Sequence, residues 1–526
     1  TMILSMSMTA FAAEASKGTL TVNNTVEGKT LDLYQIFTAT KNGENVAYTL
    51  NSAYEGFFKN NTRIPGSESL TGEALSEAAY NYVKEQVGAN GEADTAKTFA
   101  KDVLGWILDS KNNITVTTTV NTTENSTQIS GLAYGYYLVY PKGATDTSTA
   151  PGNGNQTYTS AASLVNITAD TATINMKSNY PTVVKKVNDK TADDVNIGDT
   201  VTYTLTSKVP DMTGYTSYVF NFKDTLSAGL TFKEITSVTV GDTTITKVEA
   251  GQEANDTYTL TQAGQNITIT MNNFLASNAN KVGQEIKVTY TATLNKDAVT
   301  GFDPNTNKAT VEYSNKPGTD DKGESEPSKV DVHTFNFTIF KYYLKGETQT
   351  GLANAEFELY KANEAGDAAD TNAKINIVKV KEGEYRQATP EEAVAEVFKS
   401  DVIVSGTDGK VLVKGLDAGT YYLRETKAPD GYNKLLSDIK VEIKATYGED
   451  GKLVSYKVDY TYNGTTTPGV AITEKNNSPE VPVENKTGAQ LPSTGSKGAL
   501  MVTLAGIVLF GALTASKAFG KKKAKN

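Results

Sequence analysis

Residues 198–209 read GDTVTYTLTSKV, and residues 284–294 read QEIKVTYTATL. In both stretches apolar or aromatic side chains alternate with polar ones, which is the pattern of a β-strand with one buried face. Comparable stretches occur at residues 218–226 and 266–271, and turn clusters such as Asn-Asp and Gly-Asp separate them. The pattern predicts a β-sandwich over residues 181–331.

Similar units flank this one. Residues 332–487 begin with the alternating stretch FNFTIFKYYL and are predicted to be all β. Residues 14–180 combine strand-like stretches with a helical insertion, roughly residues 68–110, because apolar side chains recur there at spacings of three and four. The whole chain is therefore predicted to be mainly β, with three tandem Ig-like β-sandwich domains.

Composition excludes several functions. The 526 residues carry a net charge of −10, which gives no basic face for nucleic acid. Cysteine is absent, so disulfides, thiolate catalysis and zinc–thiolate sites are excluded. The single histidine, His333, rules out metal sites that need two, and any Ser-His-Asp triad would have to use it. We expect no metal and no cofactor, and a secreted enzyme is a remote alternative.

The two ends indicate export. Residues 1–13 resemble the end of a truncated signal peptide, with cleavage near Ala12 or Ala13, although a buried first strand is the alternative. Residues 488–526 contain LPSTG, then an apolar stretch over residues 498–516 and a lysine-rich tail. The stretch is just long enough to cross a bilayer as a helix, and the lysines favour the cytoplasmic side.

This order of elements resembles the sorting signal that sortases recognise on Gram-positive surface proteins. The resemblance implies that a sortase cuts between Thr494 and Gly495 and passes the Thr494 carbonyl to an amine. The protein would then be secreted, anchored to peptidoglycan and displayed at the cell surface. A plain transmembrane anchor is the alternative. The five residues of the sortase motif are Leu491, Pro492, Ser493, Thr494 and Gly495.

Within residues 332–487, the stretch GLDAGTYYLRETKAPDGY (415–432) resembles the glutamate-bearing strand of collagen-adhesin B-type domains. In that family a lysine and an asparagine form an internal isopeptide bond beside a glutamate. The resemblance implies Lys341, Asn485 and Glu425, with the neighbouring residues 476–477 as alternative asparagines. Burial would keep the lysine amine neutral and nucleophilic, and would keep the acid protonated so that it polarises the asparagine carbonyl.

The middle unit resembles the related D2-type pilin domain, which uses an aspartate instead. FKDTLSAGLTF (222–232) matches the aspartate strand and implies Asp224, and NKATVEYSN (307–315) matches the last strand and implies Asn307. Lys185 is the expected nucleophile because it shares a strand face with valines 183 and 187. A register slip of one residue would select Lys186.

The first unit contains LVYPKG (138–143), which resembles the core of the pilin motif. In that family the lysine attacks the sortase-bound carbonyl of the next subunit, which implies Lys142 as acceptor and Thr494 as donor. The sequence departs from the motif at Ala133, where the motif has tryptophan, and at Tyr137, where it has valine. We expect Lys142 to be exposed, and we expect no internal isopeptide bond in this unit.

Taken together, these features resemble a major, or backbone, pilin of a sortase-assembled fimbria. The resemblance implies a structural shaft subunit whose partners are a sortase, identical subunits, minor pilins and peptidoglycan. A host surface ligand is a further candidate partner. Catalysis would be confined to the intramolecular bonds, promoted by Asp224 and Glu425. The alternative is an anchored adhesin or minor pilin that uses the same domains as a stalk.

Overall fold

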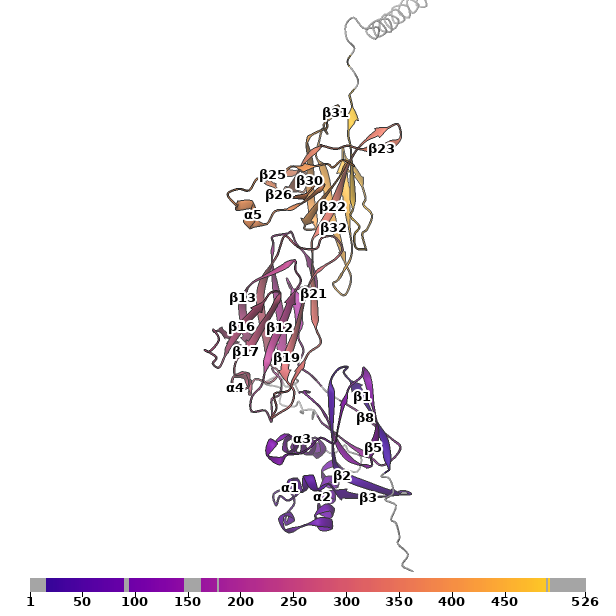
Figure 1. Ribbon diagram of the computed structural model, residues 1–526, viewed down its shortest axis with the longest axis vertical. Coiled ribbons are helices and arrows are strands. Elements are labelled where there is room, and N and C mark those ends of the chain that lie inside the picture. Colours follow the sequence, from indigo (N-terminus) through magenta and orange to yellow (C-terminus); the bar gives the residue numbers. More distant parts are fainter. Residues whose placement is uncertain (1–15, 89–93, 146–161, 177–178, 489–490, 492–526) are drawn as a thin grey trace, which may run out of the picture.

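The computed structural model describes residues 16–88, 94–145, 162–176, 179–488 and 491, which form three β-rich domains placed end to end (Figure 1). The prediction of a mainly β chain is confirmed. Among the described residues, no helix is both long and apolar enough to cross a bilayer. The expected signal peptide, most of the LPSTG motif and the apolar stretch at residues 498–516 lie outside the described residues.

The N-terminal domain contains two sheets and a helical insertion. One sheet has the order β5-β1-β8, and the other has the order β3-β2-β6-β7 with β4 beside β2. The strands are β1 (Lys17–Thr25), β2 (Thr30–Asn42), β3 (Asn45–Leu50), β4 (Thr118–Asn121), β5 (Asn125–Ala133), β6 (Gly135–Pro141), β7 (Ser163–Ile167) and β8 (Thr171–Asn175). One apolar cluster lies between the sheets, and a second includes side chains of the helices and of β2 and β6.

The helical insertion lies between β3 and β4, as its apolar periodicity predicts. Its two longer helices bury Leu75, Ala79 and Val83 from one and Phe99 and Val103 from the other. The helices are α1 (Glu55–Phe58), α2 (Gly72–Val87) and α3 (Asp94–Leu108), with short 3-10 turns at η1 (Ser52–Tyr54), η2 (Ser67–Ser69) and η3 (Ser110–Asn112). These helices pack on the sheet that contains β2 and β6, and β6 ends at Pro141.

The middle domain is a sandwich of two larger sheets. One has the order β14-β13-β18-β11-β9, and the other β10-β21-β19-β12-β17-β16-β15 with β20 beside β19. The elements are β9 (Val184–Val187), β10 (Ala192–Asp194), β11 (Thr200–Lys208), β12 (Phe220–Leu226), β13 (Leu230–Val240), β14 (Thr243–Thr244), β15 (Thr246–Lys247), β16 (Thr257–Ala263), β17 (Asn266–Met271), α4 (Phe274–Asn278), β18 (Glu285–Leu294), β19 (Asn305–Ser314), β20 (Lys322–Glu324) and β21 (Ser328–His333). A single apolar core fills the space between the sheets.

The C-terminal domain is a second sandwich, with sheet orders β23-β22-β29-β27-β26 and β25-β24-β30-β32-β33-β34. In the first sheet β35 pairs in parallel with β22, so the first and last long strands of the domain are neighbours. The elements are β22 (Phe335–Lys345), β23 (Thr348–Gly351), β24 (Glu356–Ala362), β25 (Ala369–Lys374), β26 (Ile377–Lys381), β27 (Glu384–Gln387), α5 (Pro390–Val394), β28 (Ile403–Val404), β29 (Lys410–Leu416), β30 (Gly419–Lys427), β31 (Tyr432–Asn433), β32 (Ile439–Tyr447), β33 (Leu453–Tyr462), β34 (Thr465–Thr467), β35 (Glu480–Glu484) and β36 (Lys486–Thr487).

Polar contacts join the middle and C-terminal domains. The Ile197 backbone N–H donates to the Gly415 carbonyl at 3.0 Å. The Asp194 carboxylate accepts from the Ala418 N–H at 3.0 Å and from the Tyr447 hydroxyl. Asp194 belongs to the acidic stretch 189–194, which as a sequence resembles a solvated turn, yet here it fixes one domain against the next.

Candidate functional site

The middle domain brings together the three residues named from its sequence. Lys185 lies on β9, in one sheet of the sandwich, and its side chain points into the core because alternate residues of β9 are buried. Asp224 and Asn307 lie on the neighbouring strands β12 and β19 of the other sheet, where Asn307 is paired with Leu226. All three side chains are buried, whereas Lys186 is exposed.

A tyrosine connects these residues. The Lys185 amine donates to the Asp224 carboxylate and, at 2.8 Å, to the Tyr290 hydroxyl. That hydroxyl donates to Asp224 Oδ2 at 2.8 Å and accepts from Asn307 Nδ2 at 2.6 Å. The amine also lies 4.8 Å from the centre of the Tyr203 ring, which stacks on Tyr290. The lysine is therefore enclosed by one acid and two aromatic rings.

Burial changes the ionisation of this site. It lowers the pKa of Lys185 to about 8, although the Asp224 charge opposes the shift. It also raises the pKa of Asp224, against the opposing effects of Lys185 and Tyr290. Both shifts favour the neutral forms, since each charged form loses hydration in the core. Both groups are thereby shifted toward the forms in which the amine is nucleophilic and the carboxyl group can donate a hydrogen bond.

The C-terminal domain arranges its three residues differently. Lys341 lies on β22, and Asn485 directly follows β35, the parallel neighbour of β22. The Asn485 N–H donates to the Tyr342 carbonyl at 2.9 Å, which holds the asparagine beside the lysine. Glu425 comes from β30 in the opposite sheet, and all three side chains are buried. Residues 476–477, the alternative asparagines, lie in an exposed turn.

Contacts within this second site converge on the glutamate. Lys341 Nζ lies 3.0 Å from Glu425 Oε1. The other oxygen, Oε2, accepts from Asn485 Nδ2 at 3.0 Å and from the Leu435 N–H at 2.8 Å. Burial lowers the pKa of Lys341 to about 8, while the glutamate charge opposes the shift.

Both sites contain a buried asparagine oxygen that needs a donor. Among the described residues, none donates a hydrogen bond to Asn307 Oδ1 or to Asn485 Oδ1, and Asp224 Oδ1 also lacks a partner. A buried polar atom without a partner is costly, so a donor at these positions would be stabilising. A protonated acid beside the asparagine is one such donor, and it would draw electron density from the amide carbon.

Tyr290 and Tyr203 were not identified from the sequence as part of the middle site. Each stands at the centre of a Thr-Tyr-Thr triplet, and the two are directly paired between β11 and β18. The strand alternation does place both on the buried face, together with Lys185. It does not show that a hydroxyl reaches the acid and the asparagine, because that depends on the distance between the two sheets.

Lys142 lies where the N-terminal domain meets the middle domain. Its backbone N–H donates to the Thr30 carbonyl at 2.8 Å, and its amine forms an ion pair with Asp321 of the middle domain. The lysine side chain is 18% exposed, so the expectation of an exposed lysine is only partly met. Asp321 belongs to the polar stretch at residues 316–328, which as a sequence is typical of a linker or a long surface loop. This stretch also contains β20, so it is a structured part of the middle domain.

Fold and buried groups together define a class: an extended protein of tandem β-sandwiches, with a lysine, an acid and an asparagine gathered in the core of two domains. The comparisons agree with this class. Residues 197–317 match the family of the Gram-positive pilin backbone subunit 2, Cna-B-like domain, and residues 342–457 match the SpaA prealbumin-like fold domain. The chain thus carries domains of Gram-positive backbone pilins.

Individual relatives are pilus and surface proteins. The trypsin-resistant surface T6 protein of Streptococcus pyogenes is 26% identical over 49% of this chain and 44% of its own length, so the match spans less than half of that relative. The solved T6 backbone pilin of Streptococcus pyogenes aligns with 91% of this chain and all of its own, at 18% identity and a TM-score of 0.44. The major pilin SpaA of Corynebacterium diphtheriae aligns with 89% of this chain and all of its own, at 17% identity and a TM-score of 0.44.

Proposed function

We propose that this protein is the structural shaft subunit of a covalently polymerised cell-surface pilus. Subunits would be joined by a sortase through Lys142 of one copy and Thr494 of the next. Each would be stabilised by two internal amides, Lys185–Asn307 and Lys341–Asn485. The observation that supports this most is that two separate domains each bury a lysine against an acid and an asparagine. Burying such ionisable groups costs desolvation free energy, so their presence in both cores indicates a function.

The internal reaction is a balanced amide exchange. In the middle domain the neutral Lys185 amine attacks the Asn307 side-chain carbon, and a new N–C bond forms. The bond from that carbon to Nδ2 breaks, and ammonia leaves after taking up the proton that the amine loses. Asp224 carries this proton between the two nitrogens, assisted by Tyr290, which contacts both the acid and the leaving nitrogen.

The C-terminal domain supports the same reaction between adjacent strands. Glu425 contacts both nucleophile and leaving group, since one oxygen faces Lys341 and the other accepts from the Asn485 amide. The acid therefore sits where it can take a proton from the amine and give one to the departing nitrogen. Because the lysine and asparagine lie on neighbouring parallel strands, little movement is needed to bring them into reaction.

The intermolecular joint needs a donor end that can reach a second subunit. Seven residue steps separate Thr487, the last residue of β36, from Thr494. An extended chain of that length spans at most about 25 Å, so the donor domain must lie close to the acceptor Lys142. The joined domains would then continue end to end, as they do within one chain (Figure 1).

The direct test is intact mass spectrometry of the purified protein, followed by peptide mapping. Each internal amide releases one ammonia, so we expect a total mass deficit of about 34 Da, with cross-linked peptides that contain Lys185 with Asn307 and Lys341 with Asn485. In cells we expect a ladder of high-mass polymers that disappears with Lys142→Ala. A full mass with no cross-linked peptides would contradict the internal bonds.

The adhesin or minor-pilin alternative shares the sorting signal and the sandwiches but does not need the acceptor lysine. If Lys142→Ala leaves the polymer ladder intact, or if wild-type protein forms no ladder while remaining wall-bound, the shaft function is wrong and the stalk alternative is favoured.

A further inference from the structure

The segment that follows the acceptor lysine, residues 143–145, packs against the middle domain. Gly143 has φ +84°, and a Cβ atom there would lie 2.7 Å from Asn315 Cβ, so a larger residue would collide. The Thr145 hydroxyl donates to the Asp211 carbonyl at 2.9 Å, and the Tyr140 hydroxyl donates to the Asn315 carbonyl at 3.4 Å. The acceptor segment is therefore held on both sides, by the start of β2 in its own domain and by loops of the next domain.

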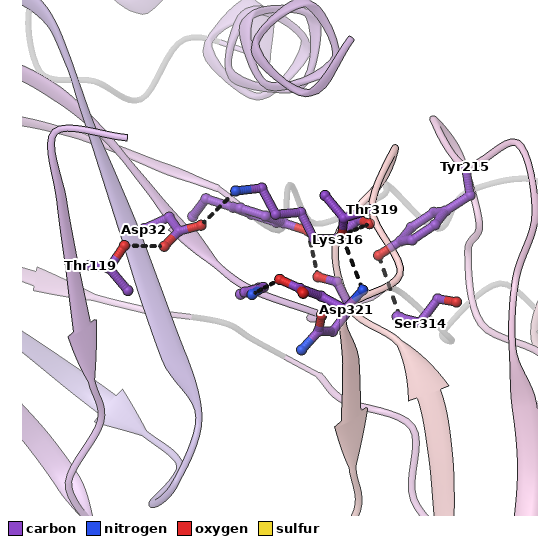
Figure 2. Close-up of polar contacts among 10 residues, drawn as sticks. Asp32, Thr119, Tyr215, Ser314, Lys316, Thr319 and Asp321 are labelled. Carbon is purple, nitrogen blue, oxygen red and sulfur yellow. Dashed lines mark hydrogen bonds and ion pairs between the residues drawn. The ribbon is translucent and has the colours of Figure 1, made fainter. Parts of the chain in front are cut away.

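Charges cross this joint in both directions. Lys142 of the N-terminal domain contacts Asp321 of the middle domain, with 2.5 Å between Nζ and Oδ2. Lys316 of the middle domain lies 3.5 Å from Asp32 of the N-terminal domain, whose other oxygen accepts from Thr119 at 2.8 Å. Figure 2 shows Asp32 facing Lys316 across the joint, with Asp321 on the same loop of the middle domain.

The two ion pairs differ in their access to solvent. Asp32 is buried, with 3% of its side chain exposed, whereas the Asp321 side chain is 54% exposed. The Asp32–Lys316 pair therefore belongs to the packed joint, and the Lys142–Asp321 pair lies at its rim. A rim position lets an incoming acyl group reach the lysine amine while the lysine stem stays held between the domains.

We propose that Asp321 is a positioning residue for the Lys142 amine, so that the acceptor site is shared between the N-terminal and middle domains. This inference rests on the function proposed above and adds to it a residue that lies about 180 positions further along the chain. A long, flexible lysine side chain at a strand end samples many rotamers. An acid fixed on the adjoining domain restricts the amine to one direction.

The step that Asp321 assists is acyl transfer from a thioester to an amine. The acyl donor is the Thr494 carbonyl of a second copy, carried on the cysteine of the sortase. The Lys142 side chain reacts as the free amine, after releasing one proton to water, while Asp321 restricts its direction. The amine nitrogen then bonds to the carbonyl carbon, the C–S bond breaks, and the thiolate takes the second proton as the amide forms. Asp321 is unchanged at the end.

The test uses the full chain carrying Thr494→Ala, which cannot act as a donor, with a pilus sortase and the synthetic peptide GAQLPSTGSK. Initial rates of peptide attachment at Lys142 are measured against acceptor concentration, to separate kcat from KM. We expect Asp321→Ala to lower kcat by roughly tenfold or more, with a smaller change in KM, and Asp321→Glu to recover most of that loss. Asp320→Ala, a change at the adjacent exposed acid, is expected to match the parent.

A second control separates positioning of the amine from stability of the joint. Lys316→Ala breaks the Asp32 pair across the same joint without touching the acceptor, and we expect it to leave kcat within about twofold of the parent. An equal loss in Lys316→Ala and Asp321→Ala would overturn the proposal, as would a kcat in Asp321→Ala that equals or exceeds the parent. If the parent itself is not labelled at Lys142, the proposed pilus function fails instead, which is a distinct result.

Discussion

The Tyr290 hydroxyl lies 2.8 Å from the Asp224 carboxylate, between that acid and the Asn307 amide nitrogen. The tyrosine belongs to β18, in the sheet opposite to both residues, so its position depends on the packing of the sandwich. Its hydroxyl forms hydrogen bonds with all three groups of the middle site. This relationship makes Tyr290 part of the proposed reaction in the middle domain.

Replacing Tyr290 with phenylalanine should slow formation of the middle-domain amide. The ring would still pack, but the leaving nitrogen would lose its hydrogen-bond acceptor and the amine one of its two partners. We expect roughly a tenfold slower loss of ammonia, followed by intact mass at successive times after synthesis. Tyr258→Phe, a change at another buried tyrosine of this domain, is the control. Equal rates in the two variants would limit Tyr290 to packing.

Replacing Asp224 with alanine should abolish closure of the middle domain while leaving the C-terminal amide intact. Without the acid no group can move the proton from amine to leaving nitrogen. We expect a mass deficit of about 17 Da in place of about 34 Da. Lys186→Ala should retain the full deficit, because that side chain is exposed on the opposite face of β9. If Lys186→Ala lost the middle amide, the assignment of Lys185 would be wrong.

The pH dependence of stability should reveal the lowered pKa of Lys185. In an Asn307→Ala variant the amide cannot form, and Lys185 still faces Asp224, Tyr203 and Tyr290. The folded site releases its proton from about pH 8, whereas the unfolded chain keeps it to about pH 10.5. The unfolded state then binds more protons, so the free energy of unfolding should rise with pH across this window. The measurement is denaturant unfolding at pH 8 to 9.5.

The matched control for this measurement is Lys185→Met in the same Asn307→Ala background. Subtracting its unfolding free energy at each pH removes the contributions of the other lysines and tyrosines. A difference between the two variants that stays flat with pH would mean that Lys185 has an ordinary pKa in the folded domain.

Removing the C-terminal amide should make that domain melt earlier. A cross-link from Lys341 to Asn485 closes a loop of more than 100 residues, and its loss costs about 5 kcal/mol in the chain-entropy account developed for disulfides. We expect Lys341→Ala to lower Tm by roughly 10 °C and to increase cleavage by trypsin. Lys345→Ala, at an exposed position of the same strand, should do neither. An unchanged Tm in Lys341→Ala would contradict a stabilising bond.

Strand alternation was enough to predict the sandwiches, because a period of two is a local property of the chain. It also favoured Lys185 over Lys186, and the structure buries the former and exposes the latter. Alternation does not identify the residue that a buried side chain will contact in the core of the sandwich. Tyr290 lies 105 positions from Lys185, and nothing local to either residue indicates their contact.

The joint around Lys142 was beyond prediction for a related reason. Its partner Asp321 lies in a stretch so polar that it resembles a linker, and polarity alone does not distinguish a solvated loop from one seated on a neighbouring domain. The contact depends on how two folded domains meet, which is decided by their surfaces. Gly143, directly after Lys142, is a residue whose type reflects the contact between the two domains, since the side chain of a larger residue there would collide with Asn315.

The parallel pairing of β22 with β35 has a consequence for how far a pilus could stretch. With the proposed amide in place, residues 342–484 lie inside a closed ring, and tension entering at β22 leaves at Asn485 without passing through them. Those 143 residues would otherwise extend by up to about 490 Å if the domain came undone. A shaft made of such subunits would hold its length like a chain of closed links, and it would lengthen only through the segments between the linked residues, such as residues 308–340.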